Sequence, residues 1–206
     1  MYSIQKSTCK IQKIWYTVCM TKFILHGGAT STRSEKNSRF FREIVKGFDK
    51  RVKILLVYFS RDKFEWDILQ KKDKETFQSV FNGKILFDIA SEDYSEFKKQ
   101  VMSNDIVYLR GGKTPDLQKK LQKMKNFKKI IHGKVVVGSS AGAYVLSEYY
   151  YSNRLDSIFE GLGVLPIKVF CHFDESKQNA LQKLKNFGQE LETIILPEEE
   201  FIVIES

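Results

Sequence analysis

The stretch KVVVGSSAGAYVLSEYY, residues 134–150, says most about the fold of this chain. It begins with a β-branched run, continues with two serines among glycines and alanines, and ends in a run of helix-forming residues. A G-x-S-x-G sequence between a strand and a helix is the pattern of a nucleophile elbow, a tight turn that exposes a serine hydroxyl at the end of a strand. We therefore expect the central serine, Ser140, to lie on such a turn.

The rest of the chain supplies a sheet for this turn. From Lys22 onward, short apolar segments alternate with longer amphipathic ones, which is typical of a mainly parallel sheet covered by helices. We predict strands at residues 22–26, 52–59, 84–89, 105–110 and 134–138, and helices near residues 34–48, 64–82, 94–102 and 114–125. After the elbow helix we expect a strand ending at His172, a helix near residues 175–187, and two strands around the proline turn of TIILPEEEFIVIE. The pattern predicts an α/β fold, a three-layer sandwich with a mainly parallel central sheet and helices on both faces.

Length and composition bound the domain organisation. With 206 residues, 42% of them hydrophobic, and three prolines, the chain suits one globular domain, which we place at residues 20–206. Residues 1–19 differ, because they contain three lysines and no acid, and their apolar run is too short to span a membrane. We interpret them as a disordered extension or a segment outside the native protein, because Met20 begins a stretch that reads as a protein start. A short amphipathic anchor is the alternative.

The net charge and the cysteine pattern bear on which partners, metals and cellular compartment we expect. A net charge of +9 raises the question of an acidic partner. The basic residues are interleaved with acids, as in KKDKE, which is typical of a solvated helical surface, and no nucleic-acid-binding motif accompanies them. We therefore expect no nucleic-acid or membrane partner. The three cysteines are odd in number, form no C-x-x-C pair and have no zinc-site spacing, so we expect a reducing, cytoplasmic setting and no metal.

Three glycine-rich loops follow predicted strands. They are HGGATS after the first strand, RGGKTP after the fourth and GSSAGA after the fifth. All three fall at the carboxyl edge of the sheet, where open α/β sheets bind ligands, and glycine lets backbone N–H groups approach a bound group. Neither the phosphate-binding P-loop spacing nor G-x-G-x-x-G is present, so phosphate and dinucleotide binding are unsupported. The sequence therefore predicts a functional site at this edge.

A serine hydroxyl needs a base before it can act as a nucleophile, and histidine is the usual one. His132 precedes the fifth strand and falls at the wrong edge of the sheet. His26 falls at the correct edge but opens a loop that needs only its backbone. His172 ends a predicted strand and is the best base for Ser140; Ser139 would point differently off the turn. The alternative interpretations are a helix-capping serine and a strand-end histidine without a catalytic role.

A triad also needs a carboxylate to orient the imidazole and amides to bind the oxyanion. Glu198, in LPEEEF, and Asp174, two residues past the histidine, both qualify on sequence. The N–H of Ala141, directly after the nucleophile, is one candidate oxyanion donor, and the N–H of Gly112 is the other.

Together these motifs resemble the serine peptidase family of aspartyl dipeptidase (peptidase E) and cyanophycinase. The resemblance runs from about Met20 to the C-terminus and includes LHGG, the GG-x-T loop, GSSAGA, CHF and LPE. It implies the class I glutamine amidotransferase-like, flavodoxin-like fold. It also implies that Ser140 is the nucleophile, His172 the base and Glu198 the orienting acid, with oxyanion amides at Gly112 and Ala141. The order nucleophile, histidine, acid differs from that of the α/β-hydrolases.

One loop departs from the family pattern. The family sequence G-G-G-N-T is replaced by Arg110-Gly-Gly-Lys113-Thr, which adds two positive charges. Arg110, Lys113 and Gly28 are therefore our candidates for substrate binding. Glutamine amidotransferases use a cysteine nucleophile, and because Cys171 is not at the elbow, glutaminase chemistry is disfavoured.

We therefore expect a cytoplasmic serine peptidase that hydrolyses an amide bond of a small peptide through an acyl-enzyme, without metal or organic cofactor. Whether it is a monomer or a homodimer is left open. One alternative is a catalytically altered pseudoenzyme or small-ligand-binding module of the same fold. A basic nucleic-acid-associated protein is a further alternative.

Overall fold

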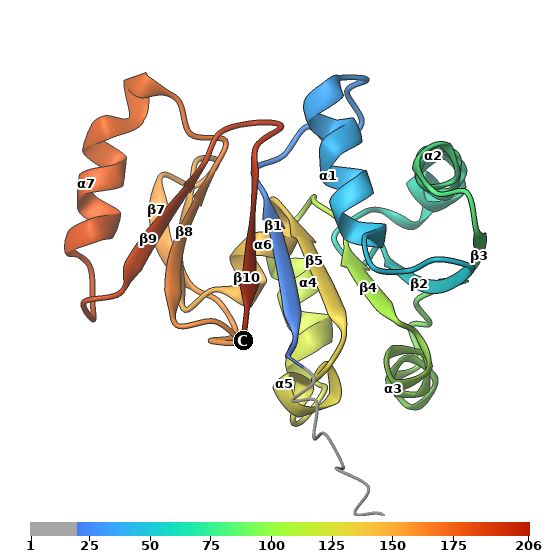
Figure 1. Ribbon diagram of the computed structural model, residues 1–206. Coiled ribbons are helices and arrows are strands. Elements are labelled where there is room, and N and C mark those ends of the chain that lie inside the picture. The colour runs from blue at the N-terminus through green and yellow to red at the C-terminus, as the bar shows by residue number, and fades with distance from the viewer. Residues whose placement is uncertain (1–19) are drawn as a thin grey trace, which may run out of the picture.

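The computed structural model describes residues 20–206, which form two sheets with helices packed against them (Figure 1). Our interpretation of residues 1–19 as an extension lies outside the described residues. No helix between residues 20 and 206 is long and apolar enough to cross a membrane.

The larger sheet has six strands in the order β10-β1-β5-β4-β2-β3. Neighbouring strands are parallel except at one edge, where β10 runs antiparallel to β1. The strands are β1 (Lys22–His26), β2 (Arg51–Val57), β3 (Lys84–Ile89), β4 (Ile106–Leu109), β5 (Val135–Ser139) and β10 (Phe201–Glu205). Every residue of β4 and β5 is buried, as expected for parallel strands covered on both faces.

Alternate residues of these strands enter two different cores. In β2, Ile54 and Leu56 pack with α1 and α2, whereas Leu55 and Val57 pack with α3 and α4. The helices thus lie on both faces of the sheet, as Figure 1 also shows. They are α1 (Glu35–Val45), α2 (Trp66–Val80), α3 (Tyr94–Ser103), α4 (Thr114–Gln122), α5 (Phe127–Ile130) and α6 (Ala141–Leu146), with a short 3-10 helix, η1 (Lys63–Glu65), before α2. The predicted α/β fold with a mainly parallel central sheet is confirmed.

A second sheet, which the sequence analysis did not predict, lies beside the first (Figure 1). Its four strands have the order β7-β6-β8-β9 and the bounds β6 (Tyr149–Ser152), β7 (Ser157–Glu160), β8 (Ile167–Cys171) and β9 (Glu192–Leu196). The 3-10 helix η2 (Glu175–Lys177) and helix α7 (Gln178–Asn186) follow β8, and α7 covers the outer face of this sheet. On the inner face, Tyr150 and Val169 join the same core as Leu25 and Leu55, so one core connects the two sheets.

Candidate active site

Ser140 occupies a sharp turn between β5 and α6. Its backbone has φ 49° and ψ −104°, which is a conformation that residues with a side chain rarely adopt. The two motif glycines permit the turn because the chain packs too closely there for a side chain. A Cβ on Gly138 would lie 2.5 Å from the carbonyl carbon of Gly142, and one on Gly142 would lie 2.3 Å from the carbonyl oxygen of Leu109. The strand, turn and helix predicted around Ser140 are all present.

His172 and Glu198 come from other loops and form a hydrogen-bonded chain with Ser140. The Oγ of Ser140 lies 2.7 Å from Nε2 of His172, and Nδ1 of His172 lies 3.1 Å from Oε1 of Glu198. Ser140 follows a strand of the larger sheet, His172 follows β8 of the second sheet, and Glu198 lies in the turn between β9 and β10. A serine nucleophile needs a base at its hydroxyl and an orienting acid behind that base, and the order of hydroxyl, imidazole and carboxylate here is compatible with that requirement.

Gly28, in the HGG loop, makes room for the imidazole. It has a φ of +132°, and a Cβ at this position would lie only 2.1 Å from Cε1 of His172. The N–H of His172 donates to the carbonyl of the neighbouring Gly27 at 3.2 Å. Gly28 therefore packs against the His172 ring and does not line the cavity described below, so these contacts give no support to its predicted role in substrate binding.

The side chain of His26 holds the same loop through hydrogen bonds to Gly28 and Asn37. It is fully buried, its Nδ1 accepts the Gly28 N–H at 3.1 Å, and its Nε2 lies 3.0 Å from Oδ1 of Asn37. Because Nδ1 accepts a bond, the proton is on Nε2, which donates to Asn37. Burial lowers the pKa of His26 to about 4, so the imidazole is neutral. The interpretation that His26 serves its loop, and not the reaction, agrees with these contacts.

The two candidate oxyanion donors lie near the serine. Ala141 is the first residue of α6 and Gly112 lines the cavity beside Ser140. The backbone N–H groups of both residues donate to no acceptor within residues 20–206. Free N–H groups at the start of a helix and in a glycine loop are suited to an anionic oxygen.

A cavity of about 560 Å³ is lined by Ser140, His172 and Glu198. One wall is aromatic, because Tyr150 stacks on Tyr144 at 4.6 Å between ring centroids and on Phe159 at 5.7 Å. The cavity also has cations at its rim, namely Lys113, Arg154 and Lys177. Sequence reasoning missed the aromatic wall and Arg154 because it did not predict the β6–β7 hairpin, for which the YYY run at residues 149–151 was the available signal. It also missed Lys177, which the 3-10 helix η2 brings to the cavity.

Two of the three rim cations already have ion-pair partners. Lys113 pairs with Asp62 at 2.8 Å, and Lys177 pairs with Asp174 at 2.7 Å. Within residues 20–206, Arg154 has no carboxylate within ion-pair distance. Arg154 is therefore the cation most available to an anionic group in the cavity.

Arg110 does not line this cavity, so the contacts of its side chain give no support to the predicted role in substrate binding. Its side chain is buried, forms an ion pair with the buried Asp73 of α2, and donates to Oγ of Ser31 at 2.8 Å. It follows Leu109, which faces the core containing α4, and strand alternation sends Arg110 to the opposite face. Burial raises the pKa of Asp73, and Arg110 and the hydroxyl of Tyr58 oppose that rise.

Asp174, the alternative orienting acid, is engaged elsewhere. Its carboxylate pairs with Lys177, and it accepts the backbone N–H of Ser176 at 3.0 Å. These hydrogen bonds, of which that from Lys177 is the strongest, lower the pKa of Asp174 to about 2. Glu198, and not Asp174, lies at Nδ1 of His172.

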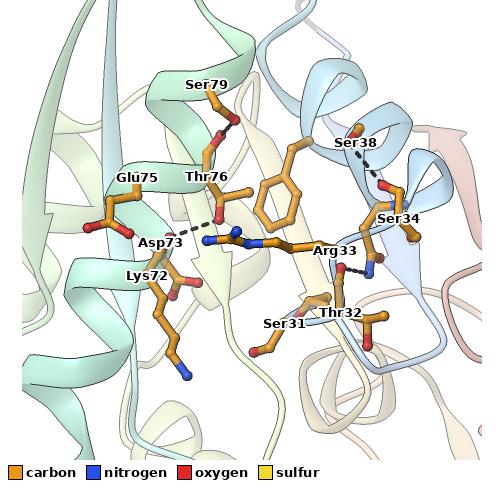
Figure 2. A pocket seen from close by; sticks show the side chains of 13 residues that line it. Ser31, Thr32, Arg33, Ser34, Ser38, Lys72, Asp73, Glu75, Thr76 and Ser79 are labelled. Carbon is orange, nitrogen blue, oxygen red and sulfur yellow. Dashed lines mark hydrogen bonds between the residues drawn. The ribbon is translucent and has the colours of Figure 1, made fainter.

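A second, larger cavity of about 770 Å³ lies between α1 and α2 (Figure 2). In Figure 2 the Arg33 side chain extends across it toward α2. Its lining is rich in hydroxyl groups, from Thr30, Ser31, Thr32, Ser34, Ser38, Thr76 and Ser79. Neither Ser140 nor His172 nor Glu198 lines it, so it is separate from the hydrogen-bonded chain. No group of three or more His, Cys, Asp or Glu side chains within residues 20–206 is placed to hold a metal ion.

Known proteins resemble this chain in sequence and in structure. The family model of peptidase family S51 matches residues 23–206. A peptidase from an acI-B1 Actinobacterium has a similar structure, with a TM-score of 0.70 and 18% identity over 93% of this chain and 86% of that one. A candidate peptidase E protein from Listeria monocytogenes EGD-e matches with a TM-score of 0.63 and 18% identity over 90% of this chain and 95% of that one. No curated protein matches the sequence. At this level of identity the two structures establish a shared fold.

Proposed function

The chain belongs to peptidase family S51 and is thus a serine peptidase, and from this premise we propose that it cleaves an amide bond of a small peptide with Ser140, His172 and Glu198 as its triad. The observation that supports the triad most directly is the pair of contacts at His172. Its Nε2 lies 2.7 Å from the Ser140 hydroxyl oxygen and its Nδ1 lies 3.1 Å from the Glu198 carboxylate. Residues 20–206 would act as one catalytic domain.

In the first step, Oγ of Ser140 attacks the carbonyl carbon of the scissile amide while its proton moves to Nε2 of His172. Glu198 accepts the Nδ1–H of His172, which keeps Nε2 free to take the proton and stabilises the imidazolium that forms. The carbonyl oxygen becomes an oxyanion, and the N–H groups of Gly112 and Ala141 donate to it.

The tetrahedral intermediate then loses its amine. The C–N bond breaks as the imidazolium of His172 gives its proton to the leaving nitrogen, and an ester remains on Ser140. Water attacks this ester, again with His172 as base, and the carboxylic acid product leaves as the Ser140 hydroxyl regains its proton. Apart from the substrate and this water, the steps use side chains and backbone groups of this chain.

The cavity suits a short peptide. Its volume, about 560 Å³, lies in the range of small-molecule sites. The aromatic wall offers a surface for an apolar part of the substrate, and Arg154 and Lys113 at the rim offer positive charge to a carboxylate. We place the reaction in a reducing compartment, the cytoplasm, because the buried Cys171 thiol has no disulfide partner within residues 20–206.

The alternative of a ligand-binding module was based on the altered Arg110–Thr114 loop. Arg110 points to the other face of the sheet, and Lys113 is paired with Asp62 at the rim. Ser140 lines the cavity, and no observation favours the alternative.

Hydrolysis of short peptides tests the proposal. Wild-type protein and Ser140→Ala are incubated with a mixture of di- and tripeptides, and the products are identified by mass spectrometry. We expect cleavage by the wild type and a loss of several orders of magnitude in Ser140→Ala. Ser139→Ala is the matched control and should retain most of the activity. Equal cleavage by Ser140→Ala and the wild type would exclude Ser140 as the nucleophile.

A further inference from the structure

Lys177 contacts the main chain of His172 and not its ring. It lies five residues further along the chain, at the end of η2. Its Nζ donates to the carbonyl oxygen of His172 and also pairs with the carboxylate of Asp174 at 2.7 Å. The ammonium group therefore links η2 to the main chain of His172 and to the side chain of Asp174.

The backbone of His172 has a conformation that contacts with neighbouring groups must stabilise. Strand β8 ends at Cys171, so His172 is outside the ladder of sheet hydrogen bonds, and it has a φ of 54°. This left-handed conformation is unfavourable for a residue with a side chain and persists where surrounding contacts impose it. One contact is the N–H of His172, which donates to Gly27. Within residues 20–206, Lys177 is the donor to the carbonyl on the other side of the residue.

The local sequence HFDESK, residues 172–177, favours the hydrogen bond between Lys177 and the His172 carbonyl. Asp174 caps η2 by accepting the N–H of Ser176 at 3.0 Å, and the turn directs Lys177 back over His172. The low pKa of Asp174, about 2, which its hydrogen bond with Lys177 largely causes, keeps it a carboxylate over the pH range in which the protein would work. The side chain of Lys177 is about one-quarter exposed, at 29%, so it is held at the surface of the site and not in the core.

We propose that Lys177 is a positioning residue that fixes the backbone of His172 and so holds its Nε2 at the Ser140 hydroxyl. This inference rests on the proposed function. Lys177 also lines the cavity, so the competing role is binding of the substrate. The two roles differ in effect: a positioning residue sets the reactivity of Ser140 toward any electrophile, whereas a binding residue sets the KM for a peptide.

The test compares Lys177→Met, Lys177→Arg and Lys183→Met with the wild type. Methionine keeps most of the aliphatic chain but removes the donor, arginine keeps donors, and the exposed Lys183 of α7 provides the same charge change away from His172. The measurements are the rate of labelling by a small uncharged alkyl fluorophosphonate, kcat and KM for a peptide that the wild type cleaves, and Tm. We expect labelling and kcat of Lys177→Met to fall by about 10- to 100-fold with KM nearly unchanged. Lys177→Arg should recover most of this loss, and Lys183→Met should match the wild type.

Several outcomes would overturn the proposal. A raised KM with unchanged labelling of Lys177→Met would make Lys177 a binding residue, and unchanged kcat and labelling would give it no role. If Lys177→Met does not fold, Asp174→Asn replaces it; removal of this second anchor should slow labelling several-fold, and an unchanged rate would contradict the inference. A folded wild type that is not labelled overturns the proposed function itself, whereas a labelled wild type with an equally reactive Lys177→Met overturns only the role of Lys177.

Discussion

At the scale of single residues, Arg110 was predicted to contact the substrate, but in the structure its side chain forms a buried ion pair with Asp73. Beside a glycine loop, a lone arginine indicates a substrate contact. In the folded chain Arg110 neutralises the carboxylate of Asp73, which is buried in α2. The same carboxylate accepts a hydrogen bond from the hydroxyl of Tyr58 at 2.9 Å. Its role is therefore structural, and its loss should affect stability more than chemistry.

We predict that Arg110→Met lowers the free energy of unfolding by about 3 kcal/mol at pH 8, because Asp73 is left buried without its cation. Burial already raises the pKa of Asp73 in the folded state, and loss of Arg110 raises it further. A carboxyl with a raised folded pKa binds protons more strongly when folded, so its contribution to stability falls as pH rises through and above its ordinary pKa. The difference from the wild type should thus be smaller at pH 4 than at pH 8.

Urea unfolding at both pH values measures this difference. Arg42→Met is the matched control, because Arg42 pairs with Glu35 at the exposed surface. That change should cost less than about 1 kcal/mol. A difference between Arg110→Met and the wild type that grows toward acid pH would contradict the assignment.

At the scale of elements, the sequence was most informative where hydrophobic periodicity is local. The predicted strands at residues 22–26 and 84–89 have the bounds of β1 and β3, and the helix predicted near residues 64–82 is α2, two residues shorter at each end. Helix ends depend on caps and turns that the periodicity does not determine.

The hairpin formed by β6 and β7 could not be recognised in the same way. The helix that starts at Ala141 ends at Leu146, and the chain turns at Ser147, whose hydroxyl lies within donating distance of the carbonyl oxygens of Tyr144 and Tyr149, at 2.8 and 3.0 Å. The next tyrosines alternate between faces, with Tyr150 in the shared core and Tyr151 under α7. Contacts distant in sequence, and not local propensity, turn this run into a strand.

This hairpin supplies the cavity wall, so a change in it should affect substrate binding. We predict that Phe159→Ala raises KM about fivefold for a peptide with an apolar side chain, because the stacked wall loses its outer ring. The rate of fluorophosphonate labelling should stay close to that of the wild type, since it depends on the reactivity of Ser140 and not on the aromatic wall. Phe64→Ala, at an exposed position of η1, is the control. An unchanged KM would show that the substrate does not use this wall.

At the scale of the whole molecule, the candidate site exists only because the two sheets pack together. Ser140 belongs to the end of the larger sheet, His172 follows a strand of the second, and Glu198 lies in the connection from β9 back to β10. The shared core that includes Leu25, Tyr150 and Val169 fixes the distance between them. The stability of the interface between the sheets therefore determines the geometry of the proposed triad.

The motifs made Ser140, His172 and Glu198 predictable as candidates, because each lies at a strand end or turn marked by its own short sequence. The cavity was not predictable, because its walls come from a hairpin, a glycine loop and a 3-10 turn that meet only in the folded chain. The path of the glycine loop after β4 was likewise not predictable, and it places Lys113 at the cavity but not Arg110.

The most direct test of the central claim is the reaction of the folded protein with an alkyl fluorophosphonate, read by intact mass and peptide mapping. An activated serine forms a stable adduct, whereas an ordinary hydroxyl does not. We predict one adduct on the wild type, located at Ser140, none on Ser140→Ala, and strongly slowed labelling of His172→Ala. A folded wild type without an adduct, or an adduct that persists in Ser140→Ala, would contradict the proposed triad.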